Sequence, residues 1–492
     1  MINMTKLLCL IAFIAAFSAS CAQDQQNNYS KSTQDTIRMV ENGLSGAVQI
    51  QDSMNTWNIE DRMKAKGVNG ISVAVIRNYK IDWAKGYGLA DKDANIPVTP
   101  LTLFQAASLS KSLNAVGVLK LAQDKKIDLY TDINQYLKSW QFPYDTVSHG
   151  KKITIANLLS HTAGLTVHGF GGYEPGDSIP TLEQILDGNR PANSEPVRSM
   201  FEPGLRSEYS GGGTTISQQI VMDVTGKPYA NYMQHNVLDP LGMTMSSYQQ
   251  PAAKDKEKYL STGYRSNGEV IKGKYHIYPE QAAAGLWTNP TDLARYIIET
   301  QLSLQGKSNK VLNTEMTKLR LTPYIDSSAA FGVFIMEKGG IKYFSHGGAN
   351  EGFRCQYFGS FDGGNGVVVM VNSDDGSIMN EIINSVAAVY KWKDFYNPTV
   401  RKAIAVTKDM LDEYSGKYVL DKDTVTISNE DGKTFLHVSN GENYRIYFSS
   451  EQDFFSPELP FDLKFEKDNS GKVTNIYFKN RGREMRAMRL QK

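Results

Sequence analysis

The sequence predicts an α/β protein in which helices pack against an antiparallel sheet, followed by a small C-terminal β-barrel or sandwich. Three observations on the 492-residue chain carry this prediction. A long helical pattern of apolar residues follows residue 108, and short β runs separated by Gly-rich turns occupy residues 331–372. From about residue 409, short alternating strands and turns follow one another to the end. Such runs are typical of an antiparallel meander and of a small barrel or sandwich.

The first 22 residues are typical of an export signal. Lys6 precedes an apolar run over residues 7–17, which is too short to span a membrane as a helix. Small residues then lead to Cys21, and Ser18-Ala19-Ser20-Cys21 resembles a bacterial lipoprotein signal in which the Cys becomes the lipidated first residue. Cleavage after Ala22 by the ordinary signal peptidase is the alternative. We expect an exported cell-envelope protein facing the periplasm or the exterior, with a lipid anchor as its membrane contact and residues 23–56 as a polar tether and N-terminal segment.

Residues 57–396 contain the elements of the predicted α/β domain. Residues 71–76 and 81–84 are expected to form a hairpin across a four-residue turn. Apolar residues at 113, 116, 119 and 122 share one face of the helix after residue 108, which predicts a buried helix. The expected meander runs through residues 331–337, 341–345, 353–361 and 367–372, and a helix over residues 378–390 closes the domain.

Composition excludes several classes of function. Cys9 would leave with the signal and Cys21 would carry the lipid, so Cys355 would remain without a partner for an internal disulfide. The formal net charge is +1 and no basic run interleaves with aromatic residues, which argues against nucleic acid as a partner. The seven His residues never fall at i, i+4 and the Cys residues have no paired spacing, so no metal site and no cofactor are implied.

Ser108 and Lys111 form a Ser-x-x-Lys step where loop-like polarity gives way to the helical pattern. Positions three apart share a helix face, so the Lys amine is expected beside the Ser hydroxyl. A serine needs a base within hydrogen-bond reach to act as a nucleophile, and an unprotonated, partly buried Lys provides one. The alternative for Ser108 is an ordinary helix cap followed by an exposed Lys. The pattern recurs in Ser148-His149-Gly150-Lys151, where a polar, loop-like setting favours a solvated connection.

Two later segments add candidate residues. Tyr209 stands in a Gly-rich stretch, expected to be a flexible turn, before the helix-like residues 216–224, and could present its phenol to a cleft. Residues 341–345 are expected to form a strand that ends at His346-Gly347-Gly348-Ala349, where absent side chains let a ligand approach the backbone. The simpler interpretations are an ordinary tyrosine and a plain inter-strand turn.

Other catalytic signatures fail on inspection. A Gly-x-Ser-x-Gly elbow around Ser210 would need Gly at the position that holds Glu208. Gly86-Tyr87-Gly88 follows a strand-like run, but Asp91 stands where a dinucleotide-binding loop needs its third Gly.

The order Ser-x-x-Lys, then Tyr-Ser after a Pro-Gly, then His-Gly-Gly resembles the serine β-lactamase and penicillin-binding-protein superfamily, specifically its class C β-lactamase and esterase branch. The resemblance runs from about Trp57 to about Tyr396 and includes residues 157–165 and 240–247. It implies a β-lactamase/transpeptidase-like fold, with an antiparallel sheet flanked by helices and an all-helical region. Residues 409–492 resemble the lipocalin-like modules appended to some relatives, for which a stabilising role is the simpler interpretation and ligand binding the alternative.

The resemblance also implies roles for individual residues. Ser108 would be the acylated nucleophile, Lys111 its activating neighbour and Tyr209 the proton shuttle. The oxyanion hole would come from the backbone N–H groups of Ser108 and Ala349.

Three positions differ from the family pattern among the expected substrate-binding residues Gly211, His346, Gly347 and Gly348. Gly211 stands where the family usually has Asn, and His346 and Gly347 replace the usual Lys and Thr. An imidazole is mostly neutral near pH 7, so binding of a substrate carboxylate is less expected. The sequence therefore predicts an exported serine hydrolase that forms an acyl-enzyme on a small ester, amide or peptide. The alternatives are a β-lactamase or D-amino-acid peptidase, and a non-catalytic envelope protein that binds wall fragments.

Overall fold

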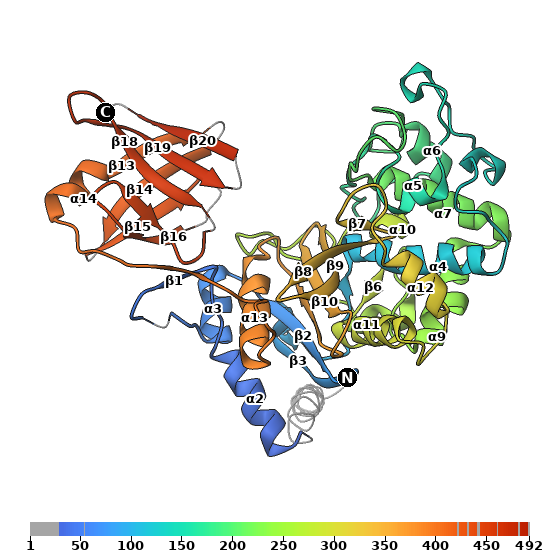
Figure 1. Cartoon of the computed structure of the whole chain (residues 1–492), viewed down its shortest axis with the longest axis horizontal. Helices are drawn as coiled ribbons and strands as arrows, with labels where there is room; N and C mark the ends of the chain where they lie inside the picture. The colour runs from blue at the N-terminus through green and yellow to red at the C-terminus, as the bar shows by residue number, and fades with distance from the viewer. Residues whose placement is uncertain are drawn as a thin grey trace, which may run out of the picture. The chain divides into compact units, whose positions relative to one another are not determined.

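The computed structural model describes residues 29–53, 55–420, 423–430, 432–439, 443–459, 461–480 and 483–490 (Figure 1). The predicted signal with Cys21, and residues 23–28 of the predicted tether, lie outside these residues. The chain divides into two compact units. Of the described residues, the first comprises those from Tyr29 to Arg38 and from Arg62 to Met379, and the second comprises those within Met39–Asp61 and after Met379. Among the described helices, none combines the length and apolar character that crossing a membrane requires.

The first unit is built on an antiparallel sheet, as predicted, with strand order β4-β3-β2-β11-β10-β9-β8-β7. The central strand β11 is buried throughout, which fits its continuous run of apolar residues. The β2–β3 hairpin turns through Asn78 and Tyr79, both with positive φ, so the turn has two residues instead of the predicted four. The strands are β2 (Gly70–Arg77), β3 (Lys80–Asp91), β4 (Ile96–Pro97), β7 (Ala329–Ala330), β8 (Val333–Lys338), β9 (Ile341–Asn350), β10 (Phe353–Ser360) and β11 (Gly366–Val371).

Helices complete the first unit. Helix α11 packs against strands β2, β3, β10 and β11, while α4, α7 and α10 contact one another in the helical region (Figure 1). Residues 110–119 of α4 are all buried, more than the one face expected, because α7, α10 and α12 all pack against this helix, and Met233 lies close to Gly117. The longer helices are α4 (Ser110–Gln123), α7 (Gly211–Thr225) and α11 (Pro290–Leu304), with short helices α5 (Ile155–Leu159), α6 (Leu182–Asp187), α8 (Tyr229–Met233), α9 (Asp239–Leu241), α10 (Gln281–Ala284) and α12 (Thr314–Arg320).

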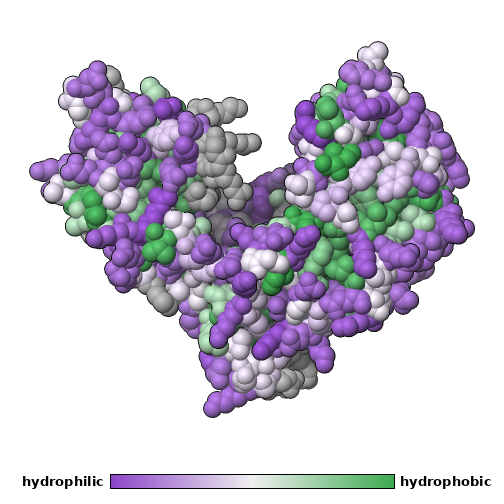
Figure 2. Space-filling view, in the orientation of Figure 1, coloured by the Kyte–Doolittle hydropathy of each residue, from purple (hydrophilic) through white to green (hydrophobic). Residues whose placement is uncertain are grey.

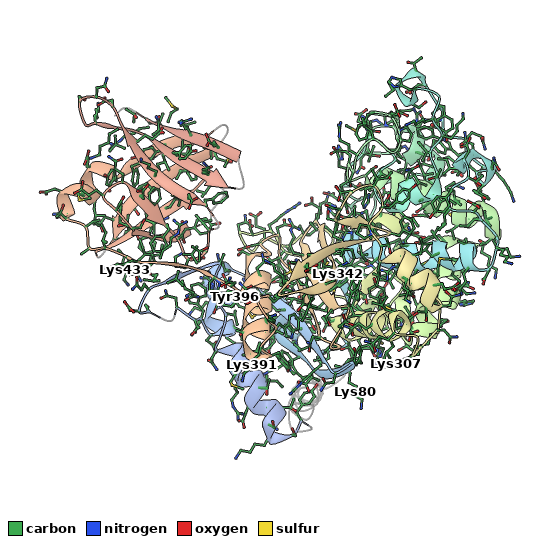
Figure 3. The ribbon with its side chains drawn as sticks, viewed as in Figure 1. Lys80, Lys307, Lys342, Lys391, Tyr396 and Lys433 are labelled. Atoms are coloured by element: carbon green, nitrogen blue, oxygen red, sulfur yellow. The ribbon has the colours of Figure 1, made fainter. Side chains whose placement is uncertain are left out.

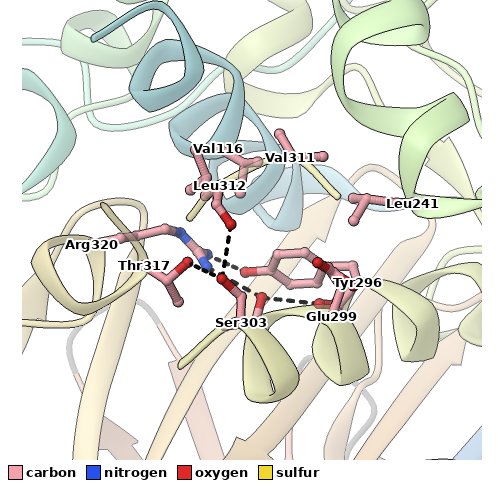
Figure 4. A pocket seen from close by; sticks show the side chains of 10 residues that line it. Val116, Leu241, Tyr296, Glu299, Ser303, Val311, Leu312, Thr317 and Arg320 are labelled. Carbon is pink, nitrogen blue, oxygen red and sulfur yellow. Dashed lines mark hydrogen bonds between the residues drawn. The ribbon is translucent and has the colours of Figure 1, made fainter. Parts of the chain in front are cut away.

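A buried polar network supports α4 from below (Figure 4). Arg320 is 1% exposed, lines a cavity of about 20 Å³, and donates to the Tyr296 hydroxyl. The Tyr296 hydroxyl lies 3.2 Å from that of Tyr357, which lies 2.8 Å from Ser112 Oγ. Ser112 follows Lys111 in the chain, so these hydrogen bonds help to hold the first turn of α4, which carries Lys111, in place.

The second unit contains a closed antiparallel barrel of strands β13 to β20, which decides between the predicted barrel and sandwich. Aromatic rings stack inside it, with centroids 4.1 Å apart for Tyr414 and Phe465 and 4.5 Å apart for Phe454 and Phe465. Helix α14 (Lys408–Tyr414) leads into the barrel. The strands are β13 (Gly416–Leu420), β14 (Asp423–Glu430), β15 (Lys433–Val438), β16 (Asn443–Phe448), β17 (Asp453–Phe455), β18 (Asp462–Lys467), β19 (Val473–Asn480) and β20 (Arg483–Arg489).

Further elements belong wholly or partly to the second unit. They are α2 (Lys31–Glu41), α3 (Ile59–Lys66), α13 (Ser377–Val389) and the parallel pair of β1 (Val48–Ile50) and β12 (Thr399–Arg401).

Polar side chains cover most of the visible face of each unit, with scattered apolar patches between them (Figure 2). The exposed lysines labelled in Figure 3 come from separate elements, for example Lys80 on β3, Lys342 on β9 and Lys433 on β15.

Candidate active site

Ser108 lies on a single 3₁₀ turn, Ala107–Leu109, that runs directly into α4. The residue before it, Ala107, has a φ of 48°, a left-handed conformation that is unfavourable for Ala. This sharp bend leads the chain from β5 (Phe104–Gln105) into the helix. Ser108 was expected at the start of the helix and stands just before it. Its side chain is partly exposed.

Lys111 meets Ser108 as the three-residue spacing predicts. Its Nζ lies 3.0 Å from Ser108 Oγ and donates to the carbonyl oxygen of Ala283 at 2.8 Å. Ala283 belongs to α10, so this short helix holds the amine in place. Lys111 is 4% exposed, so its amine is largely shielded from water.

The second Ser-x-x-Lys match forms no comparable pair. Ser148 Oγ donates to the carbonyl oxygen of Asp145 at 2.8 Å, while Lys151 is paired with Glu202. His149 between them has a left-handed φ of 51°, which ends the 3₁₀ turn Thr146–Ser148. The segment was expected to be a solvated connection. Lys151 is exposed, as expected, but Ser148 is 1% exposed.

Tyr209 joins the same group from a distant part of the chain. Its hydroxyl donates to Ser108 Oγ at 2.7 Å, and Lys111 Nζ lies 5.0 Å from the centre of its ring. The Gly-rich stretch after it was expected to be a flexible turn, and this expectation is wrong. Helix α7 begins at Gly211, because Ser210 caps it by accepting a hydrogen bond from the Gly213 N–H at 3.0 Å.

The third predicted segment lies inside a strand rather than at its end. Strand β9 continues to Asn350 because its partner β10 pairs with it throughout, including Ala349 with Arg354. A Cβ at Gly348 would lie 2.6 Å from both the Ala106 carbonyl oxygen and Cys355 Sγ. Only Gly therefore lets β9 pack against the turn that precedes Ser108. The predicted oxyanion role of the Ser108 and Ala349 N–H groups is not tested by these contacts.

The imidazole of His346 is neutral, and its Nε2 can only accept a hydrogen bond. It is 3% exposed, and its Nδ1 lies 2.6 Å from the carbonyl oxygen of Gly347, so Nδ1 carries the proton. Its Nε2 is buried and has no hydrogen-bond partner among the residues that the structure describes. Burial, reinforced by the positive charge of Lys111, lowers the pKa of His346 to about 3.

The position usually held by Asn is filled by a neighbouring ring. A Cβ on Gly211 would lie 3.0 Å from Cε2 of Phe170 and 3.2 Å from the carbonyl oxygen of His168. A side chain at residue 211 would therefore require the loop around residues 168–170 to move. The exposed Gly347, by contrast, has open space, with Cys355 O at 3.9 Å as the nearest atom.

His161, a neighbour of Tyr209, and Glu280, at the start of α10, were not predicted as site residues. His161 is 5% exposed, and its ring centroid lies 4.4 Å from that of Tyr209. Burial and the charge of Lys111 hold its pKa well below the usual value. Glu280 precedes α10, is fully buried, and burial raises its pKa to about 8. His161 lies in residues 157–165, a segment that resembles the family, and this was the sequence signal that could have pointed to it. Glu280 has no comparable signal, because its burial depends on tertiary packing.

Within the described part of the chain, no group of three or more His, Cys, Asp or Glu side chains is arranged to hold a metal ion.

Comparisons with known proteins agree with this geometry. The model of the Beta-lactamase family matches residues 57–388. The chain is 25% identical over 342 residues to the putative penicillin-binding protein PbpX of Bacillus subtilis, covering 69% of this chain and 79% of PbpX. It is 27% identical over 247 residues to protein flp of Staphylococcus aureus, covering 49% of this chain and 47% of flp, so it spans about half the length of that relative.

Solved structures share the fold. The octameric penicillin-binding protein homologue from Pyrococcus abyssi superposes with a TM-score of 0.61 at 19% identity, covering 88% of this chain and 98% of that one. The D-amino acid amidase from Ochrobactrum anthropi superposes with a TM-score of 0.55 at 21% identity, covering 73% of this chain and 99% of that one.

Proposed function

Because this chain belongs to the Beta-lactamase family, we propose that it is a serine hydrolase that forms an acyl-enzyme on a small ester or amide. One observation carries the proposal. Ser108 Oγ lies within hydrogen-bond reach of two groups that exchange protons, Lys111 Nζ at 3.0 Å and the Tyr209 hydroxyl at 2.7 Å. A serine becomes a useful nucleophile when such a partner takes its proton.

The reaction would proceed in two steps. In the first, Lys111 as the free amine takes the Ser108 proton, directly or through the Tyr209 hydroxyl, while Ser108 Oγ bonds to the substrate carbonyl carbon. The bond from that carbon to the leaving alcohol or amine then breaks, and the Lys111 and Tyr209 pair returns the proton to the leaving group. In the second, a water molecule gives a proton to the same pair as its oxygen bonds to the acyl carbon. The bond from that carbon to Ser108 Oγ then breaks, the pair returns the proton to Ser108, and the acid is released. The predicted oxyanion hole, formed by the N–H groups of Ser108 and Ala349, would stabilise the tetrahedral intermediate of each step.

Substrate choice in this proposal follows from His346 and Gly211. A carboxylate entering a partly dry site needs a charged partner, and the buried His346 offers an unprotonated Nε2 instead. We therefore expect short-chain aryl esters and uncharged amides to be better substrates than cephalosporins.

Two similar proteins suggest other substrates to test. A D-amino acid amidase shares the fold, and a putative penicillin-binding protein shares sequence, so D-amino-acid amides, D-peptides and β-lactams belong in any test panel. Binding of wall fragments without turnover is the non-enzymatic alternative.

The test is a panel of aryl esters, D-amino-acid amides, D-peptides and cephalosporins, read by turnover and by mass spectrometry of the intact protein. We expect an acyl adduct on Ser108 that Ser108→Ala abolishes together with nearly all turnover. Ser148→Ala, in the second Ser-x-x-Lys match, is the control and should keep both. Labelling that persists in Ser108→Ala, or no acyl adduct from any substrate, would overturn the proposal.

We also propose that the protein is exported and anchored by a lipid on Cys21. The support is the sequence alone, an apolar run over residues 7–17 followed by Ser18-Ala19-Ser20-Cys21. Cys21→Ser should move the protein from the membrane pellet to the soluble envelope fraction without altering its catalytic constants. A wild-type protein that is already soluble and begins at Gln23 would show that the lipoprotein interpretation is wrong.

A further inference from the structure

His161 contacts the chain on both sides of Tyr209. Its carbonyl oxygen accepts a hydrogen bond from the Glu208 N–H at 2.7 Å, and its ring Nδ1 accepts one from the Ser210 N–H at 3.3 Å. Its ring also packs against the Tyr209 ring, with centroids 4.4 Å apart and planes inclined by 39°. Three separate contacts from one residue therefore bracket Tyr209.

The backbone of His161 makes this bracket feasible. Its φ of 59° is left-handed, a conformation that non-Gly residues seldom adopt and that Asn and His tolerate better than most. Phe334 lies beside both rings, with its centroid 6.3 Å from that of His161 and 6.5 Å from that of Tyr209, and its plane is inclined by 16° to the imidazole. The imidazole is 5% exposed and so has little freedom to reorient.

The hydrogen bond from Ser210 also fixes the protonation of the ring. Because Nδ1 accepts, the proton of the neutral imidazole resides on Nε2. The Nδ1 lone pair is thus already engaged by the backbone, which leaves it unsuited to take a proton from Ser108. The structure assigns His161 a different task.

We propose that His161 is a positioning residue for Tyr209: it holds the phenol at hydrogen-bond distance from Ser108 by clamping both flanking peptides and one face of the ring. This inference rests on the proposed function, because it concerns the residue that would move the proton of Ser108. Misplacement of a reacting group by about 1 Å costs on the order of 10²-fold in rate. The clamp therefore controls the rate of acylation and leaves substrate affinity unchanged.

The two side-chain contacts are separable by substitution. His161→Asn keeps an acceptor for the Ser210 N–H and suits the left-handed backbone, but it lacks the ring. His161→Phe keeps the ring and lacks the acceptor, and His161→Ala lacks both. The matched control is His149→Asn, the same change at an exposed residue that also has a left-handed φ, of 51°.

The experiment measures the pre-steady-state burst with p-nitrophenyl acetate, which separates the acylation rate constant from the affinity for the ester. We expect His161→Ala to lower the rate constant about 10²-fold with affinity within about twofold of wild type. His161→Asn and His161→Phe should each recover at least about threefold over Ala, and His149→Asn should match wild type. Thermal melting of each variant checks that it is folded.

A second arm tests whether His161 acts through Tyr209. In a Tyr209→Phe background, which lacks the hydroxyl to be positioned, His161→Ala should cost less than about threefold more. An additional 10²-fold loss there, or His161 variants that acylate at the wild-type rate, would overturn the inference while leaving the proposed function standing. A wild-type protein that forms no acyl adduct on Ser108 would overturn both.

Discussion

The Tyr209→Phe substitution separates chemistry from stability at this site. It removes the hydroxyl that donates to Ser108 Oγ at 2.7 Å and keeps the ring that contacts His161 at 4.4 Å. The lost hydrogen bond is partly buried, so its net contribution to the free energy of unfolding is about 0.5–1.5 kcal/mol. The loss in the chemical step should be larger. General acid–base groups contribute at least about 10²-fold, which is about 2.7 kcal/mol of transition-state stabilisation.

The assay compares burst kinetics on an aryl ester with denaturant unfolding of the same variant. We expect an acylation rate constant lower by about 10²-fold or more, with the free energy of unfolding reduced by no more than about 1.5 kcal/mol. Lys111→Ala should show a similar kinetic loss with a greater loss of stability, because it also leaves the Ala283 carbonyl oxygen without the Lys111 amine. Near-normal acylation in both variants would refute the reasoning, since the hydrogen bonds to Ser108 would then have no part in the chemistry.

Two further predictions concern charge. If a charge-assisted contact contributes about 3 kcal/mol, the wild-type protein should favour neutral aryl esters over cephalosporins by about 10²-fold in kcat/KM. His346→Lys should raise kcat/KM for cephalosporins relative to the esters. An unchanged ratio would show that residue 346 does not face the substrate. In the native state Glu280 has a pKa of about 8, above the usual 4.5. Between pH 4.5 and pH 8 it therefore stays protonated in the folded protein and ionises in the unfolded chain. The free energy of unfolding should fall over this range, by up to about 5 kcal/mol. Glu280→Gln should abolish that fall in unfolding measurements at pH 5 and 9, and a wild-type slope that survives the substitution would exclude Glu280 as its source.

The parts of the site that depend on local spacing could be predicted from the sequence. Ser108 and Lys111 are three residues apart, so a short 3₁₀ turn and the first turn of α4 suffice to bring them together. The antiparallel sheet was predictable for a similar reason, because each β run and its Gly-rich turn is a local signal. Tyr209 is 101 residues from Ser108, and only its family resemblance suggested the contact that the structure places at 2.7 Å.

The errors arose where tertiary contacts decide the local conformation. Gly211 to Gly213 have low helix propensity, yet the Ser210 cap and burial on all sides make them the first turn of α7. Strand β9 runs through His346 to Ala349 because β10 supplies a partner along that whole length. Closure of the barrel, rather than a strong local pattern, specifies strands β13, β17 and β20.

Two of the three departures from the family pattern, at Gly211 and His346, act in the same direction. At residue 211 no side-chain amide is present, and the ring of Phe170 lies 3.0 Å from the place that a Cβ would take, so an apolar surface borders this position. At residue 346 burial keeps the imidazole uncharged, so a lone pair stands where the family usually presents a cation. Both changes lower the affinity expected for an anionic substrate, and neither disturbs the contacts of Ser108 with Lys111 and Tyr209. The contacts of Ser108 thus fit the proposed acyl transfer, and the two departures fit the proposed preference for a neutral ester or amide.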